Sequence, residues 1–245
     1  MKGFNELVDR LNEISNQWVH SNRSHDTGIG KTLEDLLGIE ENNFPGPNGE
    51  TVELKSIRKN SSSMITLFTK SPTPSESIKN LLEDFGYPSN NDPTKKNLHV
   101  DLYGNRVSEI KGVPSLKLSL TPSRIDIENA EGKKYGGWSY EILKKSFESK
   151  MFRVLLVKAD TRGSKGNEEF NYNEAWVLMS FSFERFITLI NKGIVKVELR
   201  LGIYPKGSKK EGRPHDHGTA FRVLEANIQD CFAYRDRIIP KMEKL

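Results

Sequence analysis

The sequence has a single cysteine, Cys231, among its 245 residues, so an internal disulfide and a cysteine metal cluster are both excluded. It has no apolar run that approaches the length of a membrane span. Its first residues place polar groups among the apolar ones instead of forming a signal-peptide core. We therefore expect a soluble cytoplasmic protein with no membrane partner.

A complete nucleotide-binding loop is also missing. The letters GIGKT at 28–32 resemble part of a phosphate loop, but that motif requires glycine five positions before Gly30, where this chain has His25. Neither sign of charge dominates, since 37 basic and 33 acidic residues leave a formal net charge of +4. This balance is compatible with a nucleic-acid partner but does not require one.

Helical and strand-like patterns alternate along the chain. Apolar residues three and four apart indicate helices, and alternating apolar residues indicate strands. The expected helices cover 2–18, a short segment that Gly38 ends, 75–85 with Ser75 as its cap, 139–149, 182–192 and a closing stretch from Leu224. The expected strands cover 50–57 and 63–69, joined as a hairpin, then 98–103, 115–120, 123–128, 152–160, 175–181 and 195–204. This mixture predicts an α/β or α+β fold around a central sheet.

The stretch PNGETVELKS at 47–56 carries the first candidate site. In a strand, Glu53 and Lys55 emerge on one side while Val52 and Leu54 face the other. Glu34, on the preceding helix, is expected to aim a carboxylate at the same place. Carboxylates can hold Mg²⁺ against a phosphodiester, and a nearby lysine can act on the attacking water. Taken alone, a Glu-x-Lys pair is more often an exposed ion pair of little energetic weight.

Four ordered blocks add a resemblance. TGIGKTLEDLLGIEENN, VELKS, ITLFTKSP at 65–72 and HDHGTAFRV at 215–223 together resemble the MvaI/BcnI type of restriction endonuclease, which is similar to the mismatch-repair nicking enzyme MutH. The resemblance runs from about Gly28 to Arg222. It implies a PD-(D/E)xK nuclease core, which is a mixed sheet flanked by helices with the active site at one sheet edge.

By position, the resemblance implies that Glu34, Asn48 and Glu53 hold Mg²⁺ and that Lys55 is the catalytic lysine. The family has an aspartate where this chain has Asn48, and an amide oxygen brings no negative charge to a cation. Three explanations are open. An engineered replacement that traps uncut DNA is preferred over a natural variant that uses Glu50 and over a nuclease fold that only binds DNA.

A basic loop in the tail carries the second candidate site. Lysines and an arginine at 206–213, including Lys209 and Lys210, are suited to phosphate contacts. The two histidines that follow, at 215 and 217, are too few ligands for a zinc site. The resemblance implies that bases are read by Arg200, His215, Asp216, His217 and Arg222, with the two arginines on guanines. Thr69 and Ala220 stand where BcnI-like members have histidines, and Lys70 follows Thr69. The chain therefore resembles the MvaI branch, which implies a CCWGG-like target.

Together these features predict a monomeric, Mg²⁺-dependent type II restriction endonuclease that acts on double-stranded DNA beside a cognate DNA methyltransferase. We expect one nuclease domain over 1–245, with a catalytic lobe at about 1–85 and 150–180 and a DNA-recognition lobe at about 86–149 and 195–223. The alternatives are a DNA-binding protein without catalysis and a MutH-like nicking enzyme. Lysines between 133 and 150 either solvate a helix face or line the duplex. Core positions are expected for Phe68, Trp138, Phe152, Trp176, Phe181 and Cys231.

Overall fold

A computed structural model describes residues 3–24, 27–39, 52–59, 64–90, 92–164 and 166–240. The chain forms two compact units, each assembled from separate stretches of sequence. Unit 1 consists of Met1–Ile65, Glu148–Ser182 and Leu224–Leu245, and unit 2 consists of Thr66–Phe147 and Phe183–Val223. Among the described residues, no helix has the length and apolar character needed to cross a membrane.

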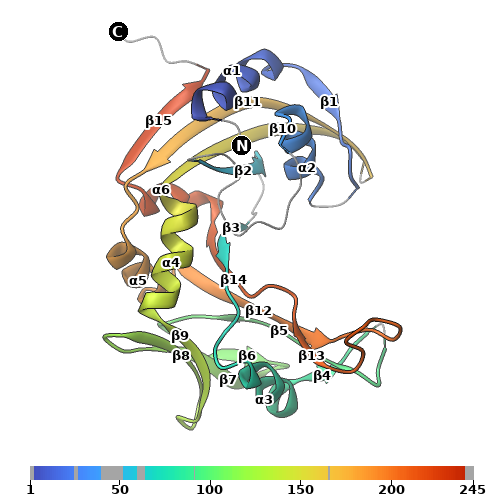
Figure 1. Ribbon diagram of the computed structural model, residues 1–245, viewed down its shortest axis with the longest axis vertical. Helices are drawn as coiled ribbons and strands as arrows, with labels where there is room; N and C mark the ends of the chain where they lie inside the picture. Colours follow the sequence, from blue (N-terminus) through green and yellow to red (C-terminus); the bar gives the residue numbers. More distant parts are fainter. Residues whose placement is uncertain are drawn as a thin grey trace. The chain divides into compact units, whose positions relative to one another are not determined.

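Unit 1 is built on a five-stranded sheet (Figure 1). Its strands are β1 (Trp18–His20), β2 (Glu53–Arg58), β10 (Arg153–Ser164), β11 (Asn167–Met179) and β15 (Tyr234–Ile239). They are ordered β1-β11-β10-β2, and β15 also pairs with β11. The β2 and β10 strands are parallel, whereas β10 and β11 form a long antiparallel hairpin. Consequently β2 is an outer strand of this sheet.

Two helices, α1 (Phe4–Ile14) and α2 (Gly28–Leu36), cover one face of the sheet in unit 1. Leucines of these helices and the Leu37 that follows α2 are buried in a core with apolar residues in and beside β2, β10 and β11: Leu7, Leu11, Leu33, Leu37, Val52, Leu54, Leu155, Val157 and Ala175. Gly38 follows α2 with φ of 65°, a left-handed conformation that glycine adopts without steric cost. The expected end of this helix at Gly38 is therefore confirmed.

A buried tyrosine ties the sheet to α2. The hydroxyl of Tyr172 donates a hydrogen bond of 2.8 Å to the carbonyl oxygen of Ile29, and burial raises the pKa of the hydroxyl. We expect Tyr172→Phe to lower the free energy of unfolding by about 1 kcal/mol, because the exchange removes one buried hydrogen bond and little volume. Urea denaturation measures this change. Tyr234→Phe is the control, since Tyr234 is 45% exposed and its exchange should leave the free energy of unfolding unaltered.

Unit 2 contains two further sheets. The larger consists of β3 (Met64–Thr69), β14 (Ala220–Leu224), β12 (Val195–Ile203), β5 (Lys96–Leu102) and β4 (Tyr87–Pro88) in that order, with β13 (Pro214–Asp216) also on β12. The smaller consists of β6 (Ser108–Ile110), β7 (Val113–Leu120), β8 (Arg124–Asn129) and β9 (Lys134–Ser139). The helices are α3 (Glu76–Phe85), α5 (Phe183–Asn191) and α4 (Tyr140–Met151), whose last residues belong to unit 1.

Aromatic packing forms the core of unit 2. The ring of Phe68 stacks on Phe221 with centroids 4.7 Å apart, and Phe147 packs against Phe186 at 5.0 Å. The indole of Trp138 is fully buried, and its N–H donates to the carbonyl oxygens of residues 70 and 71, each at 3.0 Å. The expected core positions of Phe68, Trp138, Phe181 and Cys231 are confirmed, but Phe152 is 69% exposed and Trp176 is only partly buried.

Several expected elements differ from the structure. The strands at 50–57 and 63–69 do not form a hairpin, since β2 pairs with β10 while β3 lies in another sheet. The prediction of a closing helix from Leu224 is wrong as well. Residues 225–231 form only two short helical turns, η1 (Glu225–Asn227) and α6 (Ile228–Cys231), before β15. Trp18 begins β1 instead of ending the first helix. Ser75 occupies the N-cap position of α3 without capping it through its side chain.

Candidate functional site

The first site lies on the outer strand β2. Val52 and Leu54 belong to the core beneath α1 and α2, so Glu53 and Lys55 emerge on the opposite face of the sheet. Glu53 is paired in register with Val154 of β10, and Lys55 is paired with Leu156. The predicted placement of Glu53 and Lys55 on one side of a strand is therefore confirmed.

Glu53 is held by two ammonium groups. Lys55 donates to its Oε1 at 2.6 Å, and Lys150, in the last turn of α4, donates to its Oε2 at 3.1 Å. Glu53 is only 4% exposed, and the side chains of Lys55 and Lys150 are 18% and 22% exposed. A carboxylate with so little solvent needs this compensation, because an unpaired buried charge is strongly destabilising.

Glu34 lies on α2 and is half-buried. The α2 helix packs on the Leu54 side of the sheet, whereas Glu53 emerges on the opposite side. Asn48 and its alternative Glu50 lie outside the described residues. The structure therefore brings Glu53 and Lys55 together, and the participation of Glu34 and Asn48 stays a prediction.

The donor groups at Glu53 fit a hard divalent cation. No three histidine, cysteine, aspartate or glutamate side chains converge as metal ligands in the part of the chain that the structure describes. An all-protein cage is thus absent from that part. Mg²⁺ commonly binds through one or two carboxylates together with water and phosphate oxygens. The carboxylate of Glu53 suits that mode of binding, and its hydrogen-bond partners among the described residues are lysines, not the histidine or cysteine ligands that zinc prefers.

The second site is a polar face of the larger sheet in unit 2. Arg200 on β12 lies opposite His99 on β5, and Gly202 lies opposite His215 on β13. Residues paired in register, or two apart on one strand, share a face, so these side chains lie together. The opposite face consists of buried apolar residues: Val195, Val197, Leu199, Leu201, Leu98, Val100 and Phe221. The sheet therefore buries one face and presents basic and imidazole groups on the other.

A tight turn holds Arg200. Oδ1 of Asp216 accepts hydrogen bonds from the backbone amides of Gly218 at 2.9 Å and Thr219 at 2.7 Å. The carbonyl oxygen of Gly218 in turn accepts from Nε of Arg200 at 3.1 Å. Gly218 has φ of 101°, which favours glycine. Asp216 thus positions Arg200 through the turn, and the contact of Arg200 with a base stays a prediction.

The two histidines of the tail form an aromatic cluster. The ring of His215 stacks on Tyr204 with centroids 4.1 Å apart and meets His217 edge-on at 4.3 Å. A side chain at Gly202 would collide with His217, because its Cβ would lie 2.8 Å from Nε2 of that ring. Lys209 and Lys210 are exposed in the loop between β12 and β13, and Nζ of Lys210 lies 5.7 Å from the centre of the Tyr204 ring.

Partial desolvation, the nearby His215 and then His99 lower the pKa of His217 below its ordinary value of 6.5. We therefore expect the imidazole to be neutral at pH 7 and to protonate at a lower pH than a histidine in a peptide, as an NMR titration of its ring protons will show. The unfolded chain binds this proton more readily, so His217 lowers stability as the pH falls below 6.5. The change in unfolding free energy should be small because the side chain is exposed. A midpoint at or above 6.5 would contradict this.

Arg222 and the residues at the end of β3 complete this face. The guanidinium of Arg222 donates to Oε2 of Glu198 at 2.7 Å, and its side chain is 24% exposed. Lys70 donates its backbone amide to the carbonyl oxygen of Thr219 at 2.9 Å, and Thr69 is exposed beside Gly218. Ala220 is fully buried. Thr69 and Lys70 thus join the tail block although about 150 residues separate them in sequence.

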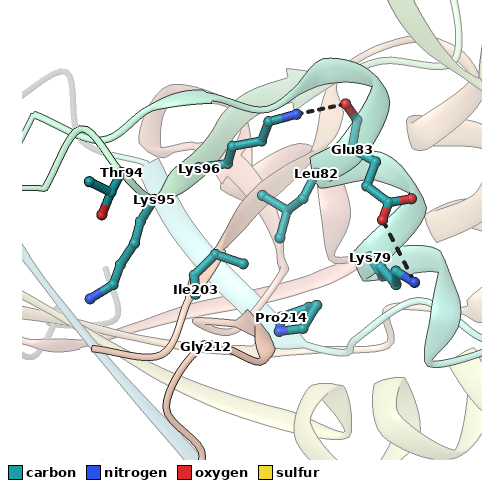
Figure 2. Close-up of a pocket in the computed structure, with 9 residues that line it drawn as sticks. All are labelled: Lys79, Leu82, Glu83, Thr94, Lys95, Lys96, Ile203, Gly212 and Pro214. Carbon is teal, nitrogen blue, oxygen red and sulfur yellow. Dashed lines mark hydrogen bonds and ion pairs between the residues drawn. The ribbon is translucent and has the colours of Figure 1, made fainter. Parts of the chain in front are cut away.

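A cavity of about 580 Å³ lies elsewhere in unit 2 (Figure 2). Leu82, Ile203 and Pro214 supply apolar contacts, and Lys79 and Lys96 are engaged by Glu83, through its carboxylate at 3.7 Å and its carbonyl oxygen at 2.9 Å respectively. None of the predicted site residues lines this cavity.

Sequence reasoning did not single out Lys150 or His99. Lys150 was one of several lysines assigned to a solvated helix or a duplex-lining surface, and no local motif links it to Glu53, 97 residues away. His99 was part of an expected strand, and only the register of β5 with β12 reveals its position opposite Arg200. Both contacts depend on tertiary pairing.

Two solved structures and a protein-family model match this chain. The chain is similar to a solved complex of restriction endonuclease MvaI with its cognate DNA substrate, with 27% identity, a TM-score of 0.82 and coverage of 98% of this chain and 100% of that chain. It is also similar to MvaI in the absence of DNA, with 27% identity, the same coverage and a TM-score of 0.59. No curated protein matches by sequence. The expected restriction-endonuclease-like mixed α/β fold is confirmed. A model of the MvaI/BcnI restriction endonuclease family matches residues 8–232, and the chain therefore belongs to this family.

Proposed function

We propose that the protein is a type II restriction endonuclease that hydrolyses phosphodiester bonds in double-stranded DNA. The observation that carries this proposal is the buried carboxylate of Glu53, with Lys55 beside it on an outer strand, in a chain of this family. The solved MvaI complex contains cognate DNA, which supports a duplex as the substrate. By the nature of that substrate, the site of action is the cytoplasm.

In the proposed reaction, the oxygen of a water molecule bonds to phosphorus while one ester P–O bond breaks. The water protons pass to the leaving oxygen and to solvent. Glu53, assisted by Glu34 and by the residue at position 48, would hold Mg²⁺, which lowers the pKa of bound water and offsets phosphate charge when present. Lys55 donates to Oε1 of Glu53 at 2.6 Å, so its ammonium group is held beside the proposed cation ligand, where it would act on the attacking water.

Sequence recognition is assigned to the polar face in unit 2. Arginine donates two parallel hydrogen bonds to guanine, so Arg200 and Arg222 are proposed to read guanines, with His215, Asp216 and His217 completing the base-reading set. Lys70, Lys209 and Lys210 would contact phosphates. Because Thr69 and Ala220 stand where BcnI-like members have histidines, we propose a CCWGG-like target, as the MvaI branch implies. Unit 1 is thus proposed as the catalytic part and unit 2 as the recognition part.

We also propose that the enzyme acts as a monomer beside a cognate DNA methyltransferase, and that Asn48 replaces the family's aspartate and suppresses cleavage. Of the three explanations for Asn48, an engineered replacement is preferred. Asparagine instead of aspartate at position 48 would leave DNA recognition intact, because the residues assigned to reading bases lie in unit 2.

Incubation of the Asn48→Asp protein alone with a plasmid of known sequence tests this function. Cleavage with Mg²⁺ or Mn²⁺ and sequencing of the ends should reveal a single recurring target. A DNA-binding protein without catalysis would shift DNA in a gel and never cut it. An enzyme of the MutH kind would nick only with a partner protein and a hemimethylated site.

A further inference from the structure

Glu53 has one more cationic partner than the Glu-x-Lys motif supplies. Lys55 accounts for Oε1, while Oε2 is bound by Lys150 from α4. Lys150 differs from Lys145 on the same helix, whose ammonium pairs with Glu141 at 2.9 Å and whose side chain is 76% exposed. The side chain of Lys150 is 22% exposed and points into the cluster around Glu53. This contact is therefore not an ordinary solvated ion pair.

The three side chains together carry a net positive charge. One carboxylate faces two ammonium groups at hydrogen-bonding distance, in surroundings with little solvent. A divalent cation that bonds to Glu53 would share this carboxylate with two lysines and would meet their charges at close range. Coulomb repulsion at such distances is large where solvent is scarce. This repulsion favours the release of one ammonium group when the cation binds.

The geometry identifies which lysine leaves. Lys55 lies two residues from Glu53 on the same strand, and its contact is short at 2.6 Å. Lys150 reaches Glu53 from the last turn of α4, 97 residues away, across 3.1 Å. Because Lys55 makes the shorter contact from the same strand, Oε2 is the oxygen that is exchanged more easily.

We propose that Lys150 is a second lysine of the active site, which occupies Oε2 of Glu53 in place of the divalent cation and yields this oxygen when the cation binds. This proposal rests on the proposed function, since it takes Glu53 as a cation ligand. Lys150 is a positioning residue in this role: it holds the buried carboxylate in place before the cation arrives. Its released ammonium group stays beside a site that receives an anionic substrate.

The test is the affinity for Mn²⁺ alone, measured by titration calorimetry on metal-stripped protein without DNA. Lys150→Met keeps the length of the stem and removes the competing charge, so it should tighten Mn²⁺ binding by on the order of tenfold. Lys150→Arg keeps the charge and should bind Mn²⁺ like the parent chain. Lys145→Met removes an equal charge from the same helix and should leave the affinity unchanged.

Thermal unfolding separates this role from simple packing. In EDTA, Lys150→Met should melt at a lower temperature than the parent, and saturating Mn²⁺ should raise its melting temperature by more than that of the parent. Equal Mn²⁺ affinities in the parent and Lys150→Met, with equal shifts in melting temperature, would overturn the inference and leave the proposed function intact. Absence of Mn²⁺ binding in all variants, including a second set carrying Asn48→Asp, would overturn both.

Discussion

Replacement of Asn48 by aspartate is expected to raise Mg²⁺-dependent cleavage of plasmid DNA by orders of magnitude. A carboxylate contributes a negative charge to the cation, whereas an amide oxygen contributes only a dipole. The chain already supplies the carboxylate of Glu53 with Lys55 beside it, so the exchange should restore a missing ligand to an otherwise formed site. Single-turnover cleavage with the protein in saturating excess over DNA measures the effect directly, because it excludes product release.

Two comparisons give this experiment its controls. DNA affinity without metal should be nearly equal for the parent and Asn48→Asp, since the residues assigned to base reading lie in unit 2. Glu50→Gln addresses the alternative in which Glu50 substitutes for the missing aspartate. Equal cleavage rates for the parent and Asn48→Asp, together with loss of activity in Glu50→Gln, would favour a natural variant and reject the engineered explanation.

Glu53→Gln is expected to abolish cleavage even when position 48 carries aspartate. The exchange removes the buried carboxylate that is assigned to the cation, and it leaves Lys55 and Lys150 facing a neutral amide. Loss of the charge-assisted hydrogen bonds should also lower the free energy of unfolding by about 1–3 kcal/mol. Cleavage assays and urea denaturation measure the two effects separately.

Glu141→Gln is the matched control for Glu53→Gln. Glu141 also pairs with a lysine, Lys145, but its side chain is 79% exposed, and exposed ion pairs contribute little. Cleavage and stability should both equal those of the parent. Retention of cleavage by Glu53→Gln would remove Glu53 from the catalytic centre, whatever its effect on stability.

Local patterns in the sequence correctly predicted how Glu53 and Lys55 are placed on β2. Alternation placed Glu53 and Lys55 on one side of a strand, and the buried Val52 and Leu54 explain why that side is opposite to α1 and α2. Strand pairing was harder to predict, because β2 joins β10, which lies about 100 residues later, and not the next strand along the chain. The polar link between 58 and 64 was therefore misread as a hairpin turn.

The chain terminus shows a second limit of local reasoning. Residues after Leu224 contain helical spacing, but only short turns form before β15 adds to the edge of β11. Pairing with an existing sheet outweighs weak helix propensity in so short a segment. Lys150 and His99 were missed for the same reason, because their partners, Glu53 and Arg200, are brought near only by tertiary contacts.

Anomalous scattering from Mn²⁺ in crystals of the protein with a DNA duplex tests the central claim most directly. The account predicts an anomalous peak within bonding distance of a carboxylate oxygen of Glu53, with Lys150 displaced from Oε2. A peak at another place, with Glu53 still held by both Lys55 and Lys150, would contradict the assignment of this cluster as the catalytic centre.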